Sequence, residues 1–334
     1  MSIAPSDELR VREVAETSAR VIDEVERVIV GKRDKLELMM AAFLTTGGHV
    51  LLEDFPGLAK TLIANSFATA LGMRFKRIQF TPDLLPGDIT GGYIFDRAQN
   101  EFVLRPGPVF ANVVLADEIN RSSPRTQSAL LEAMQEYQVT LEGETMKLEE
   151  PFIVIATQNP IEYEGTFPLP EAQLDRFIMK LSVGYPSADD EHEMLRRRRA
   201  RGQDNETLSA ITDSSQLLAM RAVVEGIHVD PDIERYMVEL VRATRTHRQA
   251  AMGASPRGTI ALLKLTRAWA ALRGRNYVLP DDVKRFAELG LAHRIIVQPD
   301  LWSVRGASAS IIADVAKTTS VPVAPRPSQS TASA

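Results

Sequence analysis

The chain has 334 residues, of which 25% are charged and 44% hydrophobic, and its formal net charge is −5. This length accommodates one large and one small domain, and the acidic balance argues against a protein whose main task is to coat nucleic acid. The sequence contains no cysteine, which excludes disulfides and thiolate metal sites and suits a reducing cytoplasm. Residues 1–10 lack an apolar secretory core, and no run approaches the roughly 20 apolar residues of a membrane span. We therefore expect a cytoplasmic protein without a membrane span, with a flexible segment at residues 1–10.

Two helices and a strand come first in the predicted order of elements. Apolar residues at helical spacing predict a helix over residues 11–30 that ends at Gly31, and a second helix over residues 34–45. The apolar run at residues 49–52 then predicts a strand, and residues 62–71 are compatible with another helix.

The segment between that strand and that helix has the character of a phosphate-binding loop. Its sequence is Glu-Asp-Phe-Pro-Gly-Leu-Ala-Lys-Thr at residues 53–61. In a strand, loop and helix unit, backbone N–H groups and the positive end of the helix converge on one place, where a polyphosphate can bind. We predict that Lys60 contacts the β- and γ-phosphates and that the Thr61 hydroxyl is a ligand of Mg²⁺.

The loop departs from the usual pattern at two positions, where Asp54 and Ala59 stand in place of glycine. We expect Ala59 to have a nearly helical backbone and Asp54 to tolerate unusual backbone angles, while Gly57 keeps the interior of the loop flexible. An ordinary Pro-Gly turn before a helix explains this stretch equally well by itself. The choice therefore depends on the rest of the chain.

Further strands and helices alternate along the chain after the loop. The pattern predicts a short strand at residues 77–80, a turn-rich stretch at 81–92, and a β-hairpin from Tyr93 to Leu104 with its turn near 96–100. The next elements are a buried strand at 112–118, a helix from Arg125, a hairpin over 139–148 and a buried strand at 152–157. The first hairpin is either a place of partner contacts or a plain surface excursion.

This alternation predicts an α/β fold with a doubly wound parallel sheet, in which ligands bind at the carboxyl ends of the strands. Lys60, Asp117 and Asn159 each lie just beyond such an end. There, Asp117 would hold Mg²⁺ through water, Glu118 would polarise the water that attacks the γ-phosphate, and Asn159 would position that water. The alternatives are a helix start at the two acids and an ordinary turn at Asn159.

Only helices are predicted after residue 186. A linker helix within residues 187–209 contains four consecutive arginines at 196–199, which we interpret as a solvated face. The alternative is a nucleic-acid contact, which the acidic total charge disfavours. Four more helices are predicted in a helical lid domain over residues 210–316: 216–225, 230–246 with an Asp230 cap, 255–273 with a Ser255 cap, and 280–289. The tail at residues 317–334 is rich in Pro, Ser, Thr and Ala and is expected to be disordered.

Two arginines are further candidates for function. Arg176 either forms a surface ion pair with Asp175 or is supplied to the ATP of a neighbouring subunit. Arg257 is at the second position of the helix capped by Ser255. It either points at phosphate together with that helix end or is an ordinary solvated residue.

Six segments, taken together, closely resemble the MoxR family of AAA+ ATPases. They are residues 53–61, Leu-Ala-Asp-Glu-Ile-Asn-Arg at 115–121, Gln-Ser-Ala-Leu-Leu-Glu-Ala-Met-Gln-Glu at 127–136, Ala-Thr-Gln-Asn-Pro at 156–160, Leu-Pro-Glu-Ala-Gln-Leu-Asp-Arg-Phe at 169–177 and Ser-Pro-Arg at 255–257. The resemblance spans about residues 15–310. It implies a P-loop AAA+ nucleotide-binding domain at residues 11–186, followed by the lid.

The resemblance also implies a role for each candidate residue. Lys60 and Thr61 correspond to Walker A, Asp117 and Glu118 to Walker B, Asn159 to sensor 1, Arg176 to the arginine finger, and Arg257 to sensor 2. Hydrolysis would move the lid through Arg257. The other residues implied to bind ATP are Ile29, Val30 and Gly31 beside the adenine, and Asp54, Pro56, Gly57, Leu58, Ala59 and Leu62 in or next to the loop.

Partners and activity follow from the resemblance as well. It implies a homo-oligomeric ring, expected to be a hexamer, that hydrolyses ATP with Mg²⁺ and remodels or matures client proteins as a chaperone does. An adaptor with a von Willebrand factor A domain is a frequent partner, and in ring-shaped relatives the segments that match 81–108 and 138–150 line the pore. Two rival hypotheses are an ATP-gated scaffold that hardly hydrolyses ATP and a DNA-remodelling motor, which the acidic charge disfavours.

Overall fold

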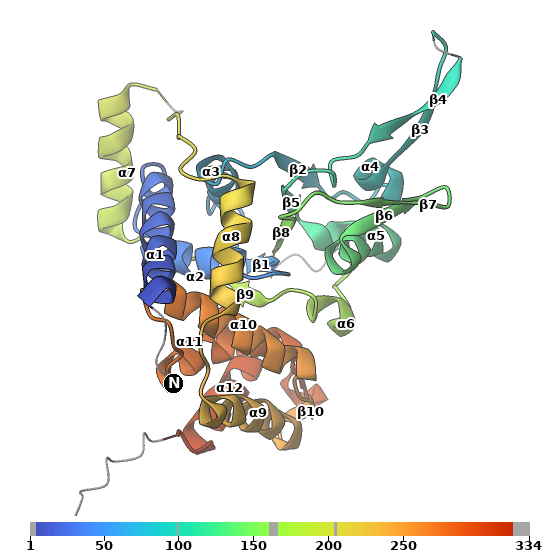
Figure 1. Cartoon of the computed structure of the whole chain (residues 1–334). Coiled ribbons are helices and arrows are strands. Elements are labelled where there is room, and N and C mark those ends of the chain that lie inside the picture. Colours follow the sequence, from blue (N-terminus) through green and yellow to red (C-terminus); the bar gives the residue numbers. More distant parts are fainter. Residues whose placement is uncertain (1–4, 99, 160–165, 204–205, 323–334) are drawn as a thin grey trace, which may run out of the picture.

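A five-stranded parallel sheet forms the centre of the larger part of the molecule (Figure 1). The computed structural model describes residues 5–98, 100–159, 166–203 and 206–322. The strands follow the order β2-β5-β8-β1-β9, and every neighbouring pair is parallel. Their bounds are Val50–Glu53 (β1), Phe75–Gln79 (β2), Val113–Asp117 (β5), Ile153–Gln158 (β8) and Met179–Leu181 (β9). The predicted α/β class is confirmed, and β9 is an edge strand that the sequence analysis did not identify.

The central strands alternate their side chains between two hydrophobic cores, one on each face of the sheet. In β5, Leu115 belongs to the first core, while its neighbours Val114 and Ala116 belong to the second. The first core also takes in helices α1 (Pro5–Glu26), α2 (Arg33–Phe43) and α3 (Lys60–Ala70), and the second takes in α4 (Pro86–Thr90) and α5 (Pro124–Glu136). Burial on both faces explains why these strands are continuous apolar runs.

The first helix begins earlier than predicted. Residues 5–10 belong to α1, so the expected flexible segment at residues 1–10 is wrong for these six residues, and residues 1–4 lie outside the described ranges. Val11 and Val14 are buried in the first core. Once such residues fix a helix, adding further turns costs little, because each added residue closes one more hydrogen bond.

Two antiparallel hairpins extend from the α/β part, as predicted, one toward the upper right of Figure 1 and one below it toward the right. The first pairs β3 (Gly91–Asp96) with β4 (Glu101–Pro106), and the second pairs β6 (Gln138–Leu141) with β7 (Glu144–Lys147). The first hairpin exposes large apolar side chains, of which Phe102 is 71% exposed, and the rings of Phe95 and Phe102 meet edge to face at 5.3 Å. Exposed apolar surface of this kind is typical of a contact site.

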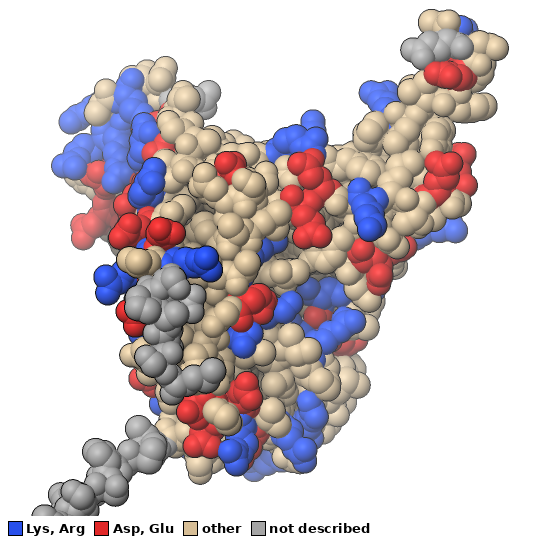
Figure 2. All heavy atoms as spheres, viewed as in Figure 1, with Lys and Arg blue, Asp and Glu red and all other residues tan. Residues whose placement is uncertain are grey.

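The predicted linker helix is α7 (Ala188–Arg201), with Ser187 as its cap. Figure 2 shows Lys and Arg gathered on the side of the molecule where α7 lies. Within this helix, Arg196 and Arg197 both pair with Glu193, and Arg197 also donates to the Glu26 carbonyl at 2.7 Å. These local pairs agree with the interpretation of the arginine run as a solvated face.

The lid contains five α-helices in the described part of the chain, of which four were predicted. They are α8 (Ser214–Glu225), α9 (Pro231–Thr246), α10 (Pro256–Leu272), α11 (Pro280–Leu291) and α12 (Ala307–Thr318). The predicted caps are confirmed, because the side chains of Asp230 and Ser255 accept hydrogen bonds from the N–H groups of Asp232 and Arg257. No helix in the described ranges has both the length and the apolar character to cross a bilayer.

Three features of the lid differ from the sequence analysis. A short ladder pairs β10 (Ala250–Met252) with β11 (Ile296–Val297), although only helices were predicted there. The fifth helix, α12, buries Ile311, Ile312 and Val315 in the first core and extends to Thr318, so residues 317–318 of the predicted tail are helical. Residues 323–334 of that tail lie outside the described ranges.

The lid docks at the end of the sheet where the strands begin. Helix α10 packs against α1 and α2, and the first core continues from the sheet into the lid helices. Lys264 of α10 donates to the carbonyl of Thr46 at 2.8 Å, and Arg221 of α8 donates from Nε to the carbonyl of Phe43 at 2.9 Å. Both carbonyls precede β1, so the lid is attached to the amino end of that strand.

Candidate functional site

The loop between β1 and α3 is fastened to the chain that follows β9. The carboxylate of Asp54 accepts hydrogen bonds from Ser182 Oγ at 2.7 Å, from Val183 N at 2.7 Å and from Gly184 N at 3.1 Å. Asp54 is buried, and its backbone does not have a positive φ. The aspartate therefore stands in place of glycine because of the bonds its side chain makes, and the explanation from unusual backbone angles is wrong.

Ala59 has a strained backbone immediately before α3. Its φ of 56° and ψ of 18° lie in the left-handed region, which costs a residue other than glycine roughly 1–2 kcal/mol. The prediction of an ordinary near-helical backbone is therefore wrong in its handedness. Gly57 has a φ of 82° and supplies the conformational freedom that was predicted for it.

Lys60 is the first residue of α3, and its side chain turns back over the loop. Its Nζ donates to the carbonyls of Asp54 at 2.7 Å and Phe55 at 3.1 Å. Burial lowers the pKa of Lys60, and the carboxylates of Asp54, Asp117 and Glu118 oppose that change. The lysine and the two acids after β5 are thus within electrostatic reach of one another.

Asp117 ends β5 and is held from both neighbouring strands. Arg77 of β2 donates to its Oδ2 from Nη2 at 2.6 Å and from Nε at 3.1 Å, and Thr157 of β8 donates to its Oδ1 at 2.7 Å. Asp117 is only 8% exposed, so these bonds fix the direction in which its carboxylate points. Sequence reasoning gave no role to Arg77 or Thr157, because their place beside Asp117 depends on a strand order that the sequence does not display.

Glu118 has a φ of 56° and a ψ of 47°, in the left-handed region. Its N–H donates to Thr157 Oγ1 at 2.8 Å. Its Oε2 accepts from Gln79 Nε2 at 2.9 Å and lies 3.3 Å from Arg121 Nη1. A positive φ outside glycine is uncommon and is concentrated at functional sites. The two adjacent carboxylates therefore have different partners.

Asn159 follows β8 and is buried. Strand β8 lies directly between β1 and β5, and all three are parallel. Their carboxyl ends consequently meet at one edge of the sheet. The strand order thus brings side by side the ends of β1, which the loop with Lys60 follows, of β5, which Asp117 ends, and of β8, which Asn159 follows.

The segment with Ile29, Val30 and Gly31 connects α1 to α2 and lies beside the start of α7. Gly31 has a φ of 70°, and a Cβ there would lie 2.1 Å from the carboxyl group of Asp190. Nearby, Lys32 Nζ donates to the carbonyl of Tyr185 at 2.7 Å, and the Tyr185 ring lies 6.1 Å from the ring of Phe55 in the phosphate loop. The segment predicted to contact adenine and the phosphate loop therefore share neighbours.

Arg176 and Arg257 lie at the other end of the sheet. Both line a cavity of about 260 Å³ together with Thr46, His49 and Ile178, which precede β1 and β9. At about 3.3 Å per residue, the four residues of β1 separate this cavity from the phosphate loop by roughly 13 Å. Arg257 is therefore next to Arg176 and not next to the phosphate loop of its own chain.

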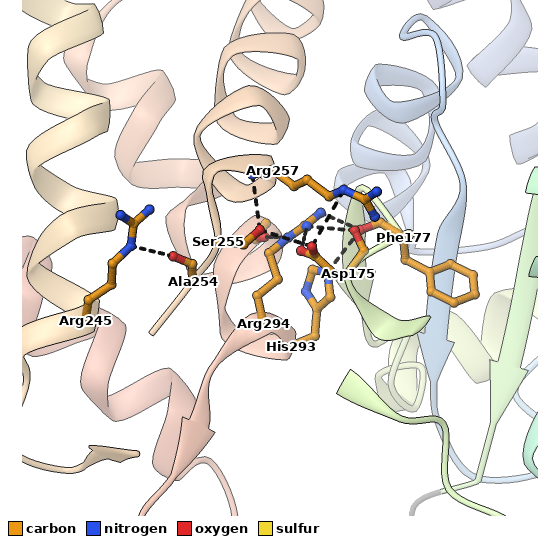
Figure 3. Close-up of polar contacts among 9 residues, drawn as sticks. Asp175, Phe177, Arg245, Ala254, Ser255, Arg257, His293 and Arg294 are labelled. Carbon is orange, nitrogen blue, oxygen red and sulfur yellow. Dashed lines mark hydrogen bonds and ion pairs between the residues drawn. The ribbon is translucent and has the colours of Figure 1, made fainter. Parts of the chain in front are cut away.

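Asp175 connects this arginine cluster to the lid (Figure 3). Its Oδ2 accepts from Ser255 Oγ at 3.0 Å and lies 3.9 Å from Arg257 Nε, and its Oδ1 pairs with Arg294. Among the described residues the ion pairs of Asp175 are with these two lid arginines, so its predicted surface pair with Arg176 is wrong. Burial and the charge of Arg257 lower the pKa of Arg176.

Comparisons with known proteins show the family and the fold. A family model described as ATPase family associated with various cellular activities (AAA) matches residues 49–179, and a model of the AAA lid domain matches residues 242–315. Chaperone MoxR1 of Mycobacterium tuberculosis is 42% identical over 315 residues, which cover 92% of this chain and 82% of that protein. This chain belongs to the MoxR family of AAA+ ATPases.

Other members and a solved structure are similar over nearly the whole length. YeaC of Bacillus subtilis, an uncharacterized protein, is 47% identical over 91% of this chain and 94% of its own. MoxR of Paracoccus denitrificans is 32% identical over 89% of this chain and 93% of its own. A crystal structure from Cytophaga hutchinsonii, provisionally described as an ATPase, matches with a TM-score of 0.88 and 40% identity, and covers 95% of this chain and 98% of that one. The MoxR-type fold, with an AAA+ domain followed by a lid, is thereby confirmed.

Proposed function

We propose that this MoxR-family protein binds ATP with Mg²⁺ and hydrolyses it at the carboxyl end of its sheet. The strand order carries the proposal, because it aligns the carboxyl ends of the three strands at or after which Lys60, Asp117 and Asn159 lie. Phosphoryl transfer to water needs positioning and charge stabilisation around the triphosphate more than covalent chemistry. A lysine, two differently held carboxylates and an amide at one edge supply both requirements.

Each residue has a distinct task in this proposal. Lys60 and the N–H groups of residues 57–61 hold the phosphates. The Thr61 hydroxyl and the Asp117 carboxylate suit Mg²⁺, because this hard cation is typically held through one or two carboxylates together with substrate phosphates. When bound, Mg²⁺ would neutralise charge on the phosphate oxygens. Glu118 takes a proton from the attacking water, and Asn159 orients that water.

Arg176 and Arg257 would complete the site of a neighbouring copy. Both are about one strand length away from the phosphate loop of their own chain, and both face the same cavity. An arginine placed against the γ-phosphate of a neighbour stabilises the charge that develops during transfer. The proposed ATP site therefore lies between two copies of the chain, and a closed ring, expected to have six members, gives every site its arginines.

A chaperone-like action on client proteins completes the proposal. The relative from Mycobacterium tuberculosis is named a chaperone, and the first hairpin of this chain exposes Ile94, Phe95 and Phe102, which could contact an unfolded segment. We place this action in the cytoplasm, with an adaptor that carries a von Willebrand factor A domain as the expected partner.

Phosphate release measured over a range of chain concentrations tests the proposal. Because each site needs a neighbour, turnover per chain should rise with concentration and then reach a plateau. The variant Glu118→Gln should still bind ATP but release phosphate roughly 10²-fold more slowly. Turnover near zero at every concentration would instead favour an ATP-gated scaffold. Full turnover by Glu118→Gln would show that Glu118 is not the general base.

A further inference from the structure

Arg176 lies on a short link between α6 (Glu171–Leu174) and β9, and the lid holds the residues on both sides of it. The lid residue responsible is Arg294, at the end of the short helix η2 (Ala292–Arg294) that follows α11. Its side chain is only 3% exposed, although it is a guanidinium. This buried lid residue therefore contacts the part of the sheet domain that presents Arg176.

The guanidinium of Arg294 brackets Arg176 by hydrogen bonds to both adjacent residues (Figure 3). Nη1 donates to the backbone carbonyl of Asp175 at 2.8 Å and also pairs with its carboxylate, and Nη2 donates to the carbonyl of Phe177 at 2.6 Å. Nε donates to the carbonyl of Gly290 at 2.7 Å, which anchors the side chain to its own helix. One planar group thus ties both peptide neighbours of Arg176 to the lid.

Two other lid residues reinforce the same contact. The Phe177 carbonyl also lies 3.0 Å from Nε2 of His293, and the Asp175 carboxylate accepts from Ser255 Oγ. Burial lowers the pKa of His293 well below its usual value, so the ring is neutral. Since a carbonyl only accepts hydrogen bonds, Nε2 is the protonated nitrogen in this contact.

The side chain of Arg176 is held much less than its backbone. Its Nε is buried and has no hydrogen-bond partner among the described residues. The nearby Arg257 contributes a like charge at the same cavity, while Glu132 and Glu136 contribute opposite charges. The backbone of Arg176 determines where this side chain begins, and Arg294 holds that backbone on both sides.

We propose that Arg294 is a positioning residue, which makes the placement of Arg176 in a neighbour's ATP site depend on the lid of its own chain. The inference rests on the proposed function, since it requires Arg176 to act on a neighbour. Stability alone does not account for Arg294, because well-packed apolar residues in place of a buried ion pair are often as stable or more stable. A lid that shifted relative to the sheet would move residues 175–177 with it.

The test compares Arg294→Met with the matched control Arg275→Met. Methionine keeps much of the side-chain volume and removes every donor. Arg275 is another lid arginine, with a two-bond pair to the buried Asp282, but its bonds stay within the lid. Arg294→Met should reduce kcat about 10- to 100-fold, since a misplacement of about 1 Å can cost 10²-fold. It should leave the Kd for ATP within about twofold, and Arg275→Met should leave both unchanged.

A mixing measurement separates positioning from a general defect. Chains with Arg294→Met keep an intact phosphate loop, and chains with Glu118→Gln keep an intact Arg176. Mixed in equal amounts, they should hydrolyse ATP faster than either variant alone, because each Glu118→Gln neighbour supplies a well-placed arginine. A second variant, Arg294→Lys, retains the charge but cannot reproduce the planar fork, and its kcat should lie between those of Arg294→Met and the wild type.

Three results would overturn the inference. A wild-type kcat in both Arg294→Met and Arg294→Lys would show that Arg294 does not position Arg176. So would a loss that mixing with Glu118→Gln does not restore in either variant, or a loss that Arg275→Met shares to the same extent. If Arg176→Ala itself leaves turnover unchanged, the proposed function fails and the inference fails with it. If Arg176→Ala abolishes turnover while Arg294→Met does not, only the inference fails.

Discussion

The two ends of the central sheet are built in opposite ways. At the carboxyl end, Pro56, Gly57 and Ala59 are exposed, and the loop is fixed from beneath by the buried carboxylate of Asp54. At the amino end, the lid packs against the sheet and buries Arg294 around the link that bears Arg176. An open end can admit a ligand, while a packed end holds a charged group in one place.

Under the proposed function, this difference means that one chain would present halves of two ATP sites. The open end has the groups that would bind and cleave ATP, and the packed end has the arginines that would serve a neighbour. A single chain in isolation would therefore bind ATP much better than it hydrolyses it. The four predictions below test this contrast between the ends, from the largest expected effect to the smallest.

Arg176→Ala tests the packed end of the sheet, because it should lower hydrolysis without lowering ATP binding. Loss of a trans-acting arginine is expected to lower kcat by roughly 10³-fold, while the Kd for ATP stays within about twofold because the phosphate loop is untouched. Steady-state phosphate release and titration with a fluorescent ATP analogue measure the two quantities. A large loss of ATP affinity with unchanged kcat would assign Arg176 to its own chain's site.

The burial of His49 at the amino end of the sheet should make the stability of the protein depend on pH. Burial lowers its pKa to about 4, whereas in the unfolded chain it is about 6.5. As the pH falls below 6.5, the imidazole of His49 binds a proton in the unfolded state but stays neutral in the folded state. This group should therefore lower the free energy of unfolding by about 2 kcal/mol between pH 7 and pH 5. Urea unfolding at both pH values measures the loss, and His49→Gln should lose about that much less. Equal losses in the two proteins would contradict the assigned cause.

Lys60→Ala should act at the open end alone. Removing a charge-assisted contact to phosphate is expected to weaken ATP binding about 10- to 100-fold, with little change in thermal stability, because its bonds in the structure are to loop carbonyls. The Kd for ATP measured by titration checks this prediction. Unaltered affinity would show that the loop does not hold the phosphates.

Ala59→Gly should have the smallest effect. Glycine relieves the left-handed strain at this position, but it also gives the unfolded chain more freedom, and the two terms together leave a gain of at most about 1 kcal/mol. Thermal unfolding of the variant measures the change. A clear loss of stability would mean that the methyl group contributes packing that outweighs the backbone strain.

The contrast between the ends also explains what could be predicted from the sequence. The phosphate loop, the acids after β5 and Asn159 each follow an apolar strand, so periodicity and position were enough to find them. The fold class, both hairpins and the caps at Asp230 and Ser255 were local patterns of the same kind. Such patterns need no knowledge of distant contacts.

What the sequence did not reveal depends on distant contacts. Thr157 and Arg77 hold Asp117 only because β8 and β2 flank β5. Arg294 is 118 positions after Arg176 in the sequence, and nothing local indicates that its side chain reaches residues 175–177. The strained backbone of Ala59 was also missed, because residues other than glycine, asparagine and aspartate are rarely found at a positive φ.

The most direct test of a site shared between two copies is a mixture of two inactive variants. Chains with Glu118→Gln retain Arg176 but lack the base, and chains with Arg176→Ala retain the base but lack the arginine. If the site forms between neighbours, the equimolar mixture should release phosphate faster than either variant alone, by a wide margin. A mixture no faster than the average of the two would contradict the shared site.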